Sequence, residues 1–598
     1  MAIGAGRRIA RAAALLRAVF VQLRVLKRPS DSAPGAFTVR PAPRFPVLRH
    51  PLLVKTWLGL LRTPLASLLL SPMLKQLGFP AWRRVPLAES PTFYPTPPRH
   101  PNGTPWDREA LAQEVLGIPG ASRVRALQDA YARGVWNPEQ VAQAFLSAWR
   151  RSEEEHPPLR AFLAVNPEHL RTQARYARER REQGAVLSPL DGIPVAVKDE
   201  FHLPPYPTTF GLKPLQYRPL QASAAVQQWE SAGVVFVGKT NMHEFGMGVT
   251  GLNRTYGTAR NPYATQHSPG GSSSGSAVAV AAGLVPLALG ADAGGSIRLP
   301  AAFCGVYGLK PTYGRVSLTL AGPLDWTLAH VGPLAGTVLD LALGFVYLAG
   351  PEAKDRHTWF QPRPDFSEWT AGRLQGLVVG VDRAWMAGVP RALADALEAL
   401  LIDLARQGAR IEEVQLSHLE EAMLAHLVTA GVEIGHAVLR WLAQGNLPLR
   451  RAAPDIQSLV LTVRYFDGQD YLRAQQWRTR MIRALEDVLR RVSVLLTPAT
   501  GALPPFLPES VLRHGEIHLT SMLNIMRFVF LANLTGHPAL VFPLGLSPEG
   551  LPMAAQAIGR YWDEATLFHL AWHVEQQRGL LPHPPRFYDL SDFMGAAG

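Results

Sequence analysis

The sequence predicts a layered α/β fold built on a β-sheet that is mixed or mostly parallel. Two observations carry this prediction: short apolar runs with the composition of buried strands recur along the C-terminal half, and helical stretches separate them. A hydrophobic content of 47% is ample for the large core that such a fold needs. The strand-like runs are residues 377–381, 410–414, 494–497 and 539–543, and the helical stretches between them include residues 392–406 and 475–491.

The chain starts with two segments that we expect to form a helical extension. Residues 7–28 place apolar side chains on one helical stripe with arginines largely opposite, a pattern typical of a helix lying at a membrane interface. A helix packed on the protein body and an organellar targeting segment explain the same pattern. Residues 51–79 are apolar but interrupted by Lys55, Arg62 and Pro64, which favours a surface-lying or docked helical pair over a membrane span.

Prolines then recur among polar residues, as in an extended linker. We therefore divide the chain into a helical extension (residues 1–79), a proline-rich linker (residues 80–106) and a body (residues 107–590). Within the body, Asn137 followed by Pro138 predicts the start of a helix, because an asparagine cap and a proline in the first turn both favour that position.

Charge and cysteine content exclude several classes of function. The formal net charge is +13, but residues 1–100 hold 16 Lys and Arg against 2 Asp and Glu, so the rest of the chain is close to neutral. We therefore expect no nucleic-acid partner. The single cysteine, Cys304, excludes an intramolecular disulfide framework and a multi-cysteine metal site, and its surroundings indicate a small buried side chain. No uninterrupted apolar run of about 18 residues occurs, so we predict no transmembrane helix.

Two apolar, strand-like segments carry a lysine at or near their C-terminal end. Residues 192–198 form a short strand that ends at Lys198, and burial there favours a neutral, basic amine. Taken alone, Lys198 is better explained as a structural lysine that reaches solvent or pairs with Asp199 or Glu200. Residues 233–240 match a phosphate-binding loop as a string, but the apolar run inside them predicts a strand, so we do not expect an ATPase.

Two glycine and serine loops give the centre of the chain its chemical character. The first, residues 270–275, precedes an alanine- and valine-rich helix that we expect to end at Gly283, and the second, residues 292–296, follows a strand-like run. Loops of this kind bring backbone N–H groups and hydroxyls close to a small ligand, which indicates an acyl-transfer site. Residues 418–446 form an apolar helical stretch that suits either a wall of the substrate channel or plain core.

Other catalytic signatures are absent from the sequence. It contains no S-x-x-K or H-E-x-x-H pattern, which excludes the usual signatures of penicillin-binding proteins and zinc proteases. His243, His267 and His537 have no acidic partner at a meaningful spacing, so we interpret them as structural. Serine and lysine side chains remain as the candidates.

On these residues the sequence resembles the amidase signature family of serine hydrolases. The resemblance covers roughly residues 120–580 and is carried by the segments GIPVAVKD, GGSSSGS, GADAGGSIRLPAAFCGVYGLKPTYGRVS, ANLTGHPALVFPLG and GLPMAAQAIGR. It implies a mixed sheet sandwiched by helices and a Ser-cisSer-Lys triad that needs no cofactor and no metal. The family's nucleophile corresponds to Ser296, its bridging serine, preceded by a cis peptide bond, to Ser272, and its base to Lys198. The oxyanion hole corresponds to the backbone amides of Ala293, Gly294, Gly295 and Ser296, with Asp292 and Arg298 supporting the loop.

The leading hypothesis is therefore a hydrolase of small-molecule carboxylic amides. The basic and apolar N-terminal residues favour a lipophilic substrate that the enzyme takes from a membrane surface, as in fatty acid amide hydrolases. We expect a cytoplasmic enzyme that associates with membranes through residues 7–79. One alternative is the glutaminase subunit of a tRNA-dependent amidotransferase, and another is a non-catalytic binding scaffold of the same fold. A homodimer is compatible with the sequence.

Overall fold

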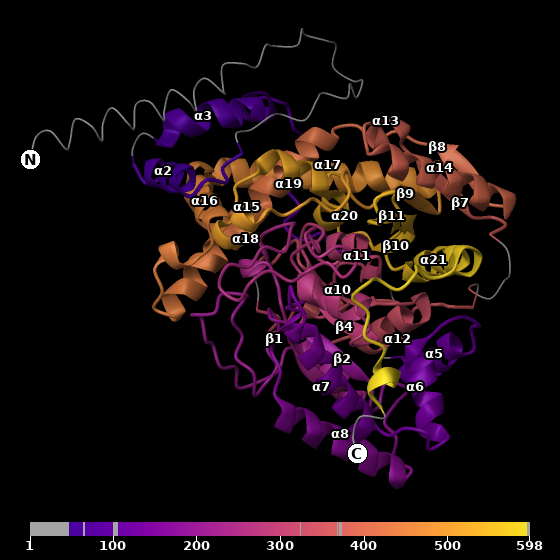
Figure 1. The fold of residues 1–598 in the computed structure, drawn as a ribbon. Coiled ribbons are helices and arrows are strands. Elements are labelled where there is room, and N and C mark those ends of the chain that lie inside the picture. Colours follow the sequence, from indigo (N-terminus) through magenta and orange to yellow (C-terminus); the bar gives the residue numbers. More distant parts are fainter. Residues whose placement is uncertain are drawn as a thin grey trace, which may run out of the picture.

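A computed structural model describes residues 47–63, 66–99, 106–322, 324–367, 369 and 374–594. Within these residues, eleven strands form one sheet in the order β1-β3-β2-β4-β6-β5-β10-β11-β9-β7-β8 (Figure 1). The strands are β1 (Phe162–Ala164), β2 (Pro194–Lys198), β3 (Val235–Thr240), β4 (Leu287–Asp292), β5 (Tyr307–Lys310), β6 (His330–Ala335), β7 (Val378–Val381), β8 (Arg410–Glu413), β9 (Val494–Pro498), β10 (Ala539–Leu546) and β11 (Pro552–Gly559).

The mixed sheet is confirmed, but the expectation that most strands would be parallel needs correction. Strand β2 is parallel to β3 and β4, and β7 is parallel to β8 and β9, whereas the other neighbouring strands are antiparallel. Two parallel blocks therefore flank an antiparallel centre. One reason lies in the connections, because the short turn from Ser547 to Leu551 joins β10 and β11 as a hairpin, and parallel strands need a longer crossover.

Helices cover both faces of the sheet. At its centre, α10 and α11 contact one face, and α12 and α21 lie together over the other (Figure 1). The helices are α2 (Pro51–Leu61), α3 (Ala66–Gln76), α4 (Phe79–Trp82), α5 (Arg108–Leu116), α6 (Arg123–Ala132), α7 (Pro138–Glu154), α8 (Pro167–Glu182), α9 (Ala224–Ser231), α10 (Ser274–Ala281), α11 (Arg298–Cys304), α12 (Val338–Leu348), α13 (Arg383–Met386), α14 (Arg391–Arg406), α15 (Leu419–Gln444), α16 (Pro454–Thr462), α17 (Gly468–Arg491), α18 (Glu509–His514), α19 (Leu519–Met526), α20 (Phe530–Thr535) and α21 (Glu564–Arg578). Short 3₁₀ turns are η1 (Glu244–Gly246), η2 (Arg356–Thr358), η3 (Leu449–Arg451), η4 (Val463–Tyr465) and η5 (Leu590–Phe593).

Local sequence signals explain several boundaries. Helix α7 begins with a capping box, in which Asn137 and Gln140 each bond the other's backbone N–H. Helix α10 ends just before Gly283, which has a φ of +77°, the left-handed conformation that a glycine at the end of a helix predicts. Residues 235–240 form strand β3, and Lys239 pairs with Asp199 at 2.9 Å inside the core, so this lysine belongs to the sheet and not to a phosphate loop.

The N-terminal elements dock on the C-terminal half of the body. Helix α2 packs on α16 with Val54, Leu58 and Leu61 buried, and α3 joins the same buried cluster, which agrees with a docked helical pair. The extended chain that follows runs along α17, where Thr92 N–H donates to the Gln475 carbonyl at 3.1 Å. The predicted helix over residues 7–28 lies outside the described residues, and the domain boundaries stay a prediction.

Helix α15 is the one helix of the described residues that is long and apolar enough to cross a membrane. Its apolar stretch is 72% buried inside the protein, as in the core helix of a globular enzyme. It packs along α17 and reaches the active-site pocket through Ile434.

Candidate active site

Lys198 stands at the end of β2 with three oxygen atoms around its amine. Its Nζ lies 2.9 Å from Ser272 Oγ, 3.3 Å from the Ala291 carbonyl and 2.8 Å from Glu200 Oε2, and the side chain is buried. A protonated amine donates to all three oxygens. A neutral amine donates to Glu200 and Ala291 and turns its lone pair to the Ser272 hydroxyl. The ion pair expected of a structural lysine and the contact expected of a base are therefore both present.

Ser272 is held in a tightly packed loop. The Gly271–Ser272 peptide bond is cis, as the family resemblance implied, and the Ser272 carbonyl accepts from His243 N–H at 3.1 Å. A Cβ atom on Gly271 would lie 2.5 Å from the Gly248 carbonyl oxygen, so only glycine fits there. This packing fixes the Ser272 hydroxyl against Lys198.

The loop that carries Ser296 is organised around the Asp292 carboxylate. Gly295 N–H donates to Asp292 Oδ1 at 2.7 Å, and Ile297 N–H donates to Oδ2 at 3.1 Å. Gly295 has a φ of +111°, and a Cβ atom there would lie 2.5 Å from Val529 Cγ2. Because the Gly295 N–H already donates to Asp292, its predicted role in the oxyanion hole needs revision, and the amides of Ala293, Gly294 and Ser296 remain candidates.

A fully buried ion pair stabilises this loop. Arg298 Nε and Nη2 each lie 2.9 Å from an oxygen of Asp292, and Asn533 Nδ2 donates to Asp292 Oδ1 at the same distance. Burial opposes ionisation of Asp292, but Arg298, Asn533 and the Gly295 N–H together hold the pKa of this carboxyl well below its usual range. Arg298 also donates to Gln556 Oε1 at 2.6 Å, which ties the loop to β11. Asp292 and Arg298 thus contact the loop that carries Ser296, and their supporting role in the reaction stays a prediction.

Residues from both glycine and serine loops border one pocket of about 260 Å³, open solvent included. Three apolar side chains complete the wall, and they belong to a buried cluster around Trp441 that we call the α15 cluster. The pocket is lined by Lys198, Ser272, Asp292, Ala293 and Ser296 among the predicted residues, by Phe245, Leu324 and Ile434 as the apolar wall, and also by Glu200, Gly246, Ala291, Asp325 and Ala329. Of the other predicted residues, Gly294 and Gly295 belong to the same loop as Ser296, and Arg298 begins helix α11 directly after it.

Sequence reasoning missed residues that reach the site from distant elements. His426 of α15 has Nε2 2.8 Å from the Ala293 carbonyl, and burial lowers the pKa of His426 to about 4, so a neutral ring donates this hydrogen bond. Asn533 and Gln556 lie in segments that carry the family resemblance, yet nothing local marks them as partners of the nucleophile loop. His243 has an acidic partner after all, because its Nε2 lies 2.7 Å from Asp455 Oδ2.

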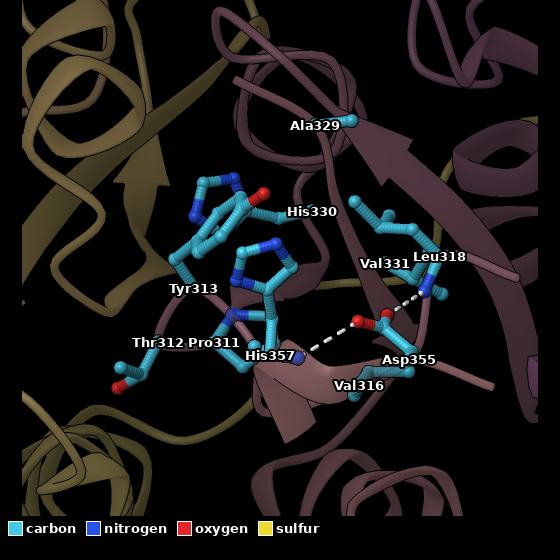
Figure 2. A pocket seen from close by; sticks show the side chains of 11 residues that line it. Pro311, Thr312, Tyr313, Val316, Leu318, Ala329, His330, Val331, Asp355 and His357 are labelled. Atoms are coloured by element: carbon cyan, nitrogen blue, oxygen red, sulfur yellow. Dashed lines mark hydrogen bonds between the residues drawn. The ribbon is translucent and has the colours of Figure 1, made fainter. Parts of the chain in front are cut away.

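A second small cavity lies beyond Ala329, which borders both cavities (Figure 2). Figure 2 shows His357 and Tyr313 side by side in it, and Asp355 accepting from the backbone N–H groups of Leu318 and His357. The Asp355 carboxylate therefore fixes the backbone at Leu318 and His357. The cavity lacks the serines and the lysine of the first pocket. In the described part of the chain, no group of three or more His, Cys, Asp or Glu side chains could hold a metal ion.

Comparisons with known proteins agree with this geometry. The sequence model of the Amidase family matches residues 143–568. The chain is 33% identical over 570 residues to a fatty acid amide hydrolase of Arabidopsis thaliana, covering 90% of this chain and 94% of the relative. It is 36% identical over 488 residues to a glutamyl-tRNA(Gln) amidotransferase subunit of Chloroflexus aggregans, covering 76% and 97%. Among solved structures, native peptide amidase of Stenotrophomonas maltophilia superposes with a TM-score of 0.66 at 29% identity, covering 77% and 98%.

Proposed function

Because the chain belongs to the amidase signature family and is an amide hydrolase, we propose that Ser296, Ser272 and Lys198 form its catalytic triad. The observation that carries the proposal is the 2.9 Å hydrogen bond between Lys198 Nζ and Ser272 Oγ, in a pocket that Ser296 also lines. A hydroxyl is a weak nucleophile at neutral pH unless a neighbouring base takes its proton. Lys198 supplies that base through Ser272.

The reaction follows from these positions. Ser296 Oγ attacks the amide carbonyl carbon while its proton passes to Ser272 and the Ser272 proton passes to Lys198. The carbonyl electrons move onto oxygen, where the amides of Ala293, Gly294 and Ser296 stabilise the negative charge. When the C–N bond breaks, the relay returns the proton to the departing nitrogen. Water, activated by the same relay, then hydrolyses the acyl-enzyme.

The apolar wall supports a lipophilic acyl chain as substrate. Phe245, Leu324 and Ile434 join the pocket to the α15 cluster, and Leu449 at the edge of that cluster also packs against α2 and α3. Apolar side chains thus lead from the catalytic serines toward the N-terminal helices. Burying an acyl chain against the apolar wall of the pocket is favourable by about 0.8 kcal/mol for each CH₂ group.

We expect kcat/KM to rise with acyl length in a panel of primary amides from acetamide to long-chain fatty amides. Replacing Ile434 with tryptophan should fill the apolar wall and shift the preference to short chains, while acetamide hydrolysis changes little and serves as the control. Steady-state kinetics on both proteins measure the shift. A preference for short chains in the wild type, or a profile that Ile434→Trp leaves unchanged, contradicts the lipophilic assignment.

We also propose that the enzyme is cytoplasmic and contacts a membrane surface through residues 7–79. Helix α2 exposes Leu52 to 54% beside exposed Lys55 and Arg62, and the exposed Arg450 and Arg451 follow Leu449, which packs on the same helices. Basic residues around an exposed leucine suit a surface of anionic lipid.

Liposome sedimentation tests this contact. We expect full-length protein to pellet with phosphatidylserine-containing vesicles and far less with pure phosphatidylcholine vesicles. The charge-reversed variant Lys55→Glu/Arg62→Glu should stay in the supernatant while it keeps activity on a water-soluble amide. Equal recovery of wild type and variant in the anionic pellet contradicts a role for α2.

A glutaminase subunit is the second candidate, favoured by the similarity to the amidotransferase of Chloroflexus aggregans. That match covers 76% of this chain, whereas the fatty acid amide hydrolase match covers 90%. Adding glutamine to the substrate panel separates the glutaminase from the fatty amide hydrolase. A glutaminase subunit would hydrolyse glutamine in preference to fatty amides when its partner proteins are present.

A further inference from the structure

The peptide group between Ala293 and Gly294 has little conformational restraint of its own. Gly294 has no Cβ atom, and Gly295 next to it has a φ of +111°, so this part of the backbone can adopt several conformations. A half-turn of the peptide would put the Ala293 carbonyl oxygen where the Gly294 N–H now stands. An oxyanion hole needs N–H groups, because a carbonyl oxygen would repel the developing negative charge. The loop therefore needs a contact that fixes this peptide.

His426 of α15 supplies such a contact. Its Nε2 lies 2.8 Å from the Ala293 carbonyl, and the side chain is only 1% exposed. A carbonyl oxygen only accepts hydrogen bonds, so Nε2 carries the hydrogen, and Nδ1, which is buried without a partner among the described residues, is the unprotonated nitrogen. Burial lowers the pKa of His426 to about 4, which keeps the ring in this neutral form.

Packing holds the imidazole ring against the loop. A Cβ atom on Gly294 would lie 2.8 Å from His426 Cε1, so the ring fits here only because Gly294 has no side chain. The Phe530 ring packs edge to face on His426, with 6.1 Å between the ring centroids. Helix α15 packs on α17 and α20, so the backbone of His426 is anchored as well. The ring therefore has little room to release the Ala293 carbonyl.

The fixed carbonyl determines where the Gly294 N–H points. The Ala293–Gly294 peptide bond is trans, so its C=O and N–H point in opposite directions and the N–H faces away from His426. The next amide, that of Gly295, donates to Asp292, whereas the Gly294 N–H has no acceptor among the described residues. Ala293 and Ser296, on either side of the two glycines, both line the active-site pocket. The Gly294 N–H is therefore a donor left for the substrate oxygen.

We propose that His426 is a positioning residue for the oxyanion hole: it holds the Ala293 carbonyl and thereby directs the Gly294 N–H at the substrate oxygen that becomes negatively charged. This inference rests on the proposed triad, because the attack of Ser296 creates that charge. It assigns to His426 no proton transfer and no contact with the substrate.

Three substitutions of His426 test the hydrogen bond. His426→Leu removes the donor, and we expect kcat to fall about tenfold to a hundredfold, less than the loss of about 10²–10³ that follows removal of a whole oxyanion donor. KM should stay within about twofold, because the oxyanion exists only in the transition state. His426→Gln, whose Nε2 is as many bonds from Cα as that of histidine, should keep kcat within about fivefold of the wild type. His426→Asn is one bond shorter and should behave like His426→Leu.

An inhibitor pair separates the oxyanion hole from the rest of the pocket. The trifluoromethyl ketone of the best-hydrolysed acyl chain accepts the Ser296 oxygen at its carbonyl carbon, so the ketone oxygen takes the electron pair and the Ser296 proton passes to the relay. The matching trifluoromethyl alcohol cannot react. In His426→Leu the ketone should bind more weakly by the factor by which kcat/KM falls, while the alcohol binds as in the wild type. Val428→Ala, a buried change on the same helix, is the control for lost packing and should alter neither ratio.

A kcat of His426→Leu within about threefold of the wild type overturns the proposal, since an oxyanion donor contributes far more. Equal weakening of ketone and alcohol, or a glutamine variant no better than leucine, overturns it too, because His426 would then support the pocket in general. Covalent labelling of the wild type by a fluorophosphonate probe tests the triad separately. An unlabelled wild type refutes the triad, whereas a labelled wild type with an unaffected His426→Leu refutes only the role of His426. His426→Asn gives the same readout if the leucine variant does not fold.

Discussion

Replacement of Ser296 by alanine is expected to abolish amide hydrolysis. In serine hydrolases, loss of the nucleophile lowers kcat by about 10⁶, down to the residual rate that substrate binding and the oxyanion donors supply. Ser296 Oγ is the atom that forms the acyl-enzyme in the proposed reaction, and the remaining hydroxyl, that of Ser272, faces Lys198 at 2.9 Å.

A fluorophosphonate probe measures this independently of the substrate. The wild type should be labelled covalently, and Ser296→Ala should not, although its unfolding midpoint stays close to that of the wild type. Ser510→Ala, a change at an exposed position of α18, serves as the matched control and should label like the wild type. Labelling of Ser296→Ala at the wild-type rate would place the nucleophile elsewhere, and a wild type that resists the probe would support the hypothesis of a binding scaffold.

The pairing of Lys198 with Ser272 could be predicted only through the family resemblance. Local pattern alone favoured a structural lysine, and the structure explains why that interpretation was reasonable, because Lys198 does pair with Glu200 at 2.8 Å. What the pattern of one strand cannot reveal is which loop its end will meet. Strand β2 pairs with β4 in the sheet, and this pairing carries the end of β2 to the two serine loops.

The rest of the site depends on contacts between segments far apart in the chain. His426, Asn533 and Asp325 reach the nucleophile loop or its pocket from α15, α20 and the loop before β6, and no short-range spacing connects them. The antiparallel direction of the central strands also depends on contacts between distant segments. Residues 539–541 pair with residues 308–310, and this long-range antiparallel register is invisible to alternation of strands and helices.

Arg298→Met is expected to be the most destabilising single change in the site. It leaves the Asp292 carboxylate buried without its cation, and breaking a buried ion pair in this way costs about 3 to 5 kcal/mol of unfolding free energy. Both side chains are fully shielded from solvent, so water cannot replace the lost guanidinium. Arg391 is the matched control, because its pair with Asp395 is 2.9 Å long but exposed, and Arg391→Met should cost less than about 1 kcal/mol.

Denaturant unfolding of the variants at several pH values tests this account. In the wild type the lowered pKa of Asp292 contributes stability that is present above the usual carboxyl range and lost as the pH falls through that lowered pKa. In Arg298→Met the sign reverses: the unpaired carboxyl prefers its protonated form, so the deficit should shrink toward acidic pH. Adding Asp292→Asn should recover part of the stability without restoring activity, because the carboxylate that accepts from Gly295 and Ile297 is then gone. An Arg298→Met deficit no larger than that of Arg391→Met would mean that the buried pair does not hold the nucleophile loop.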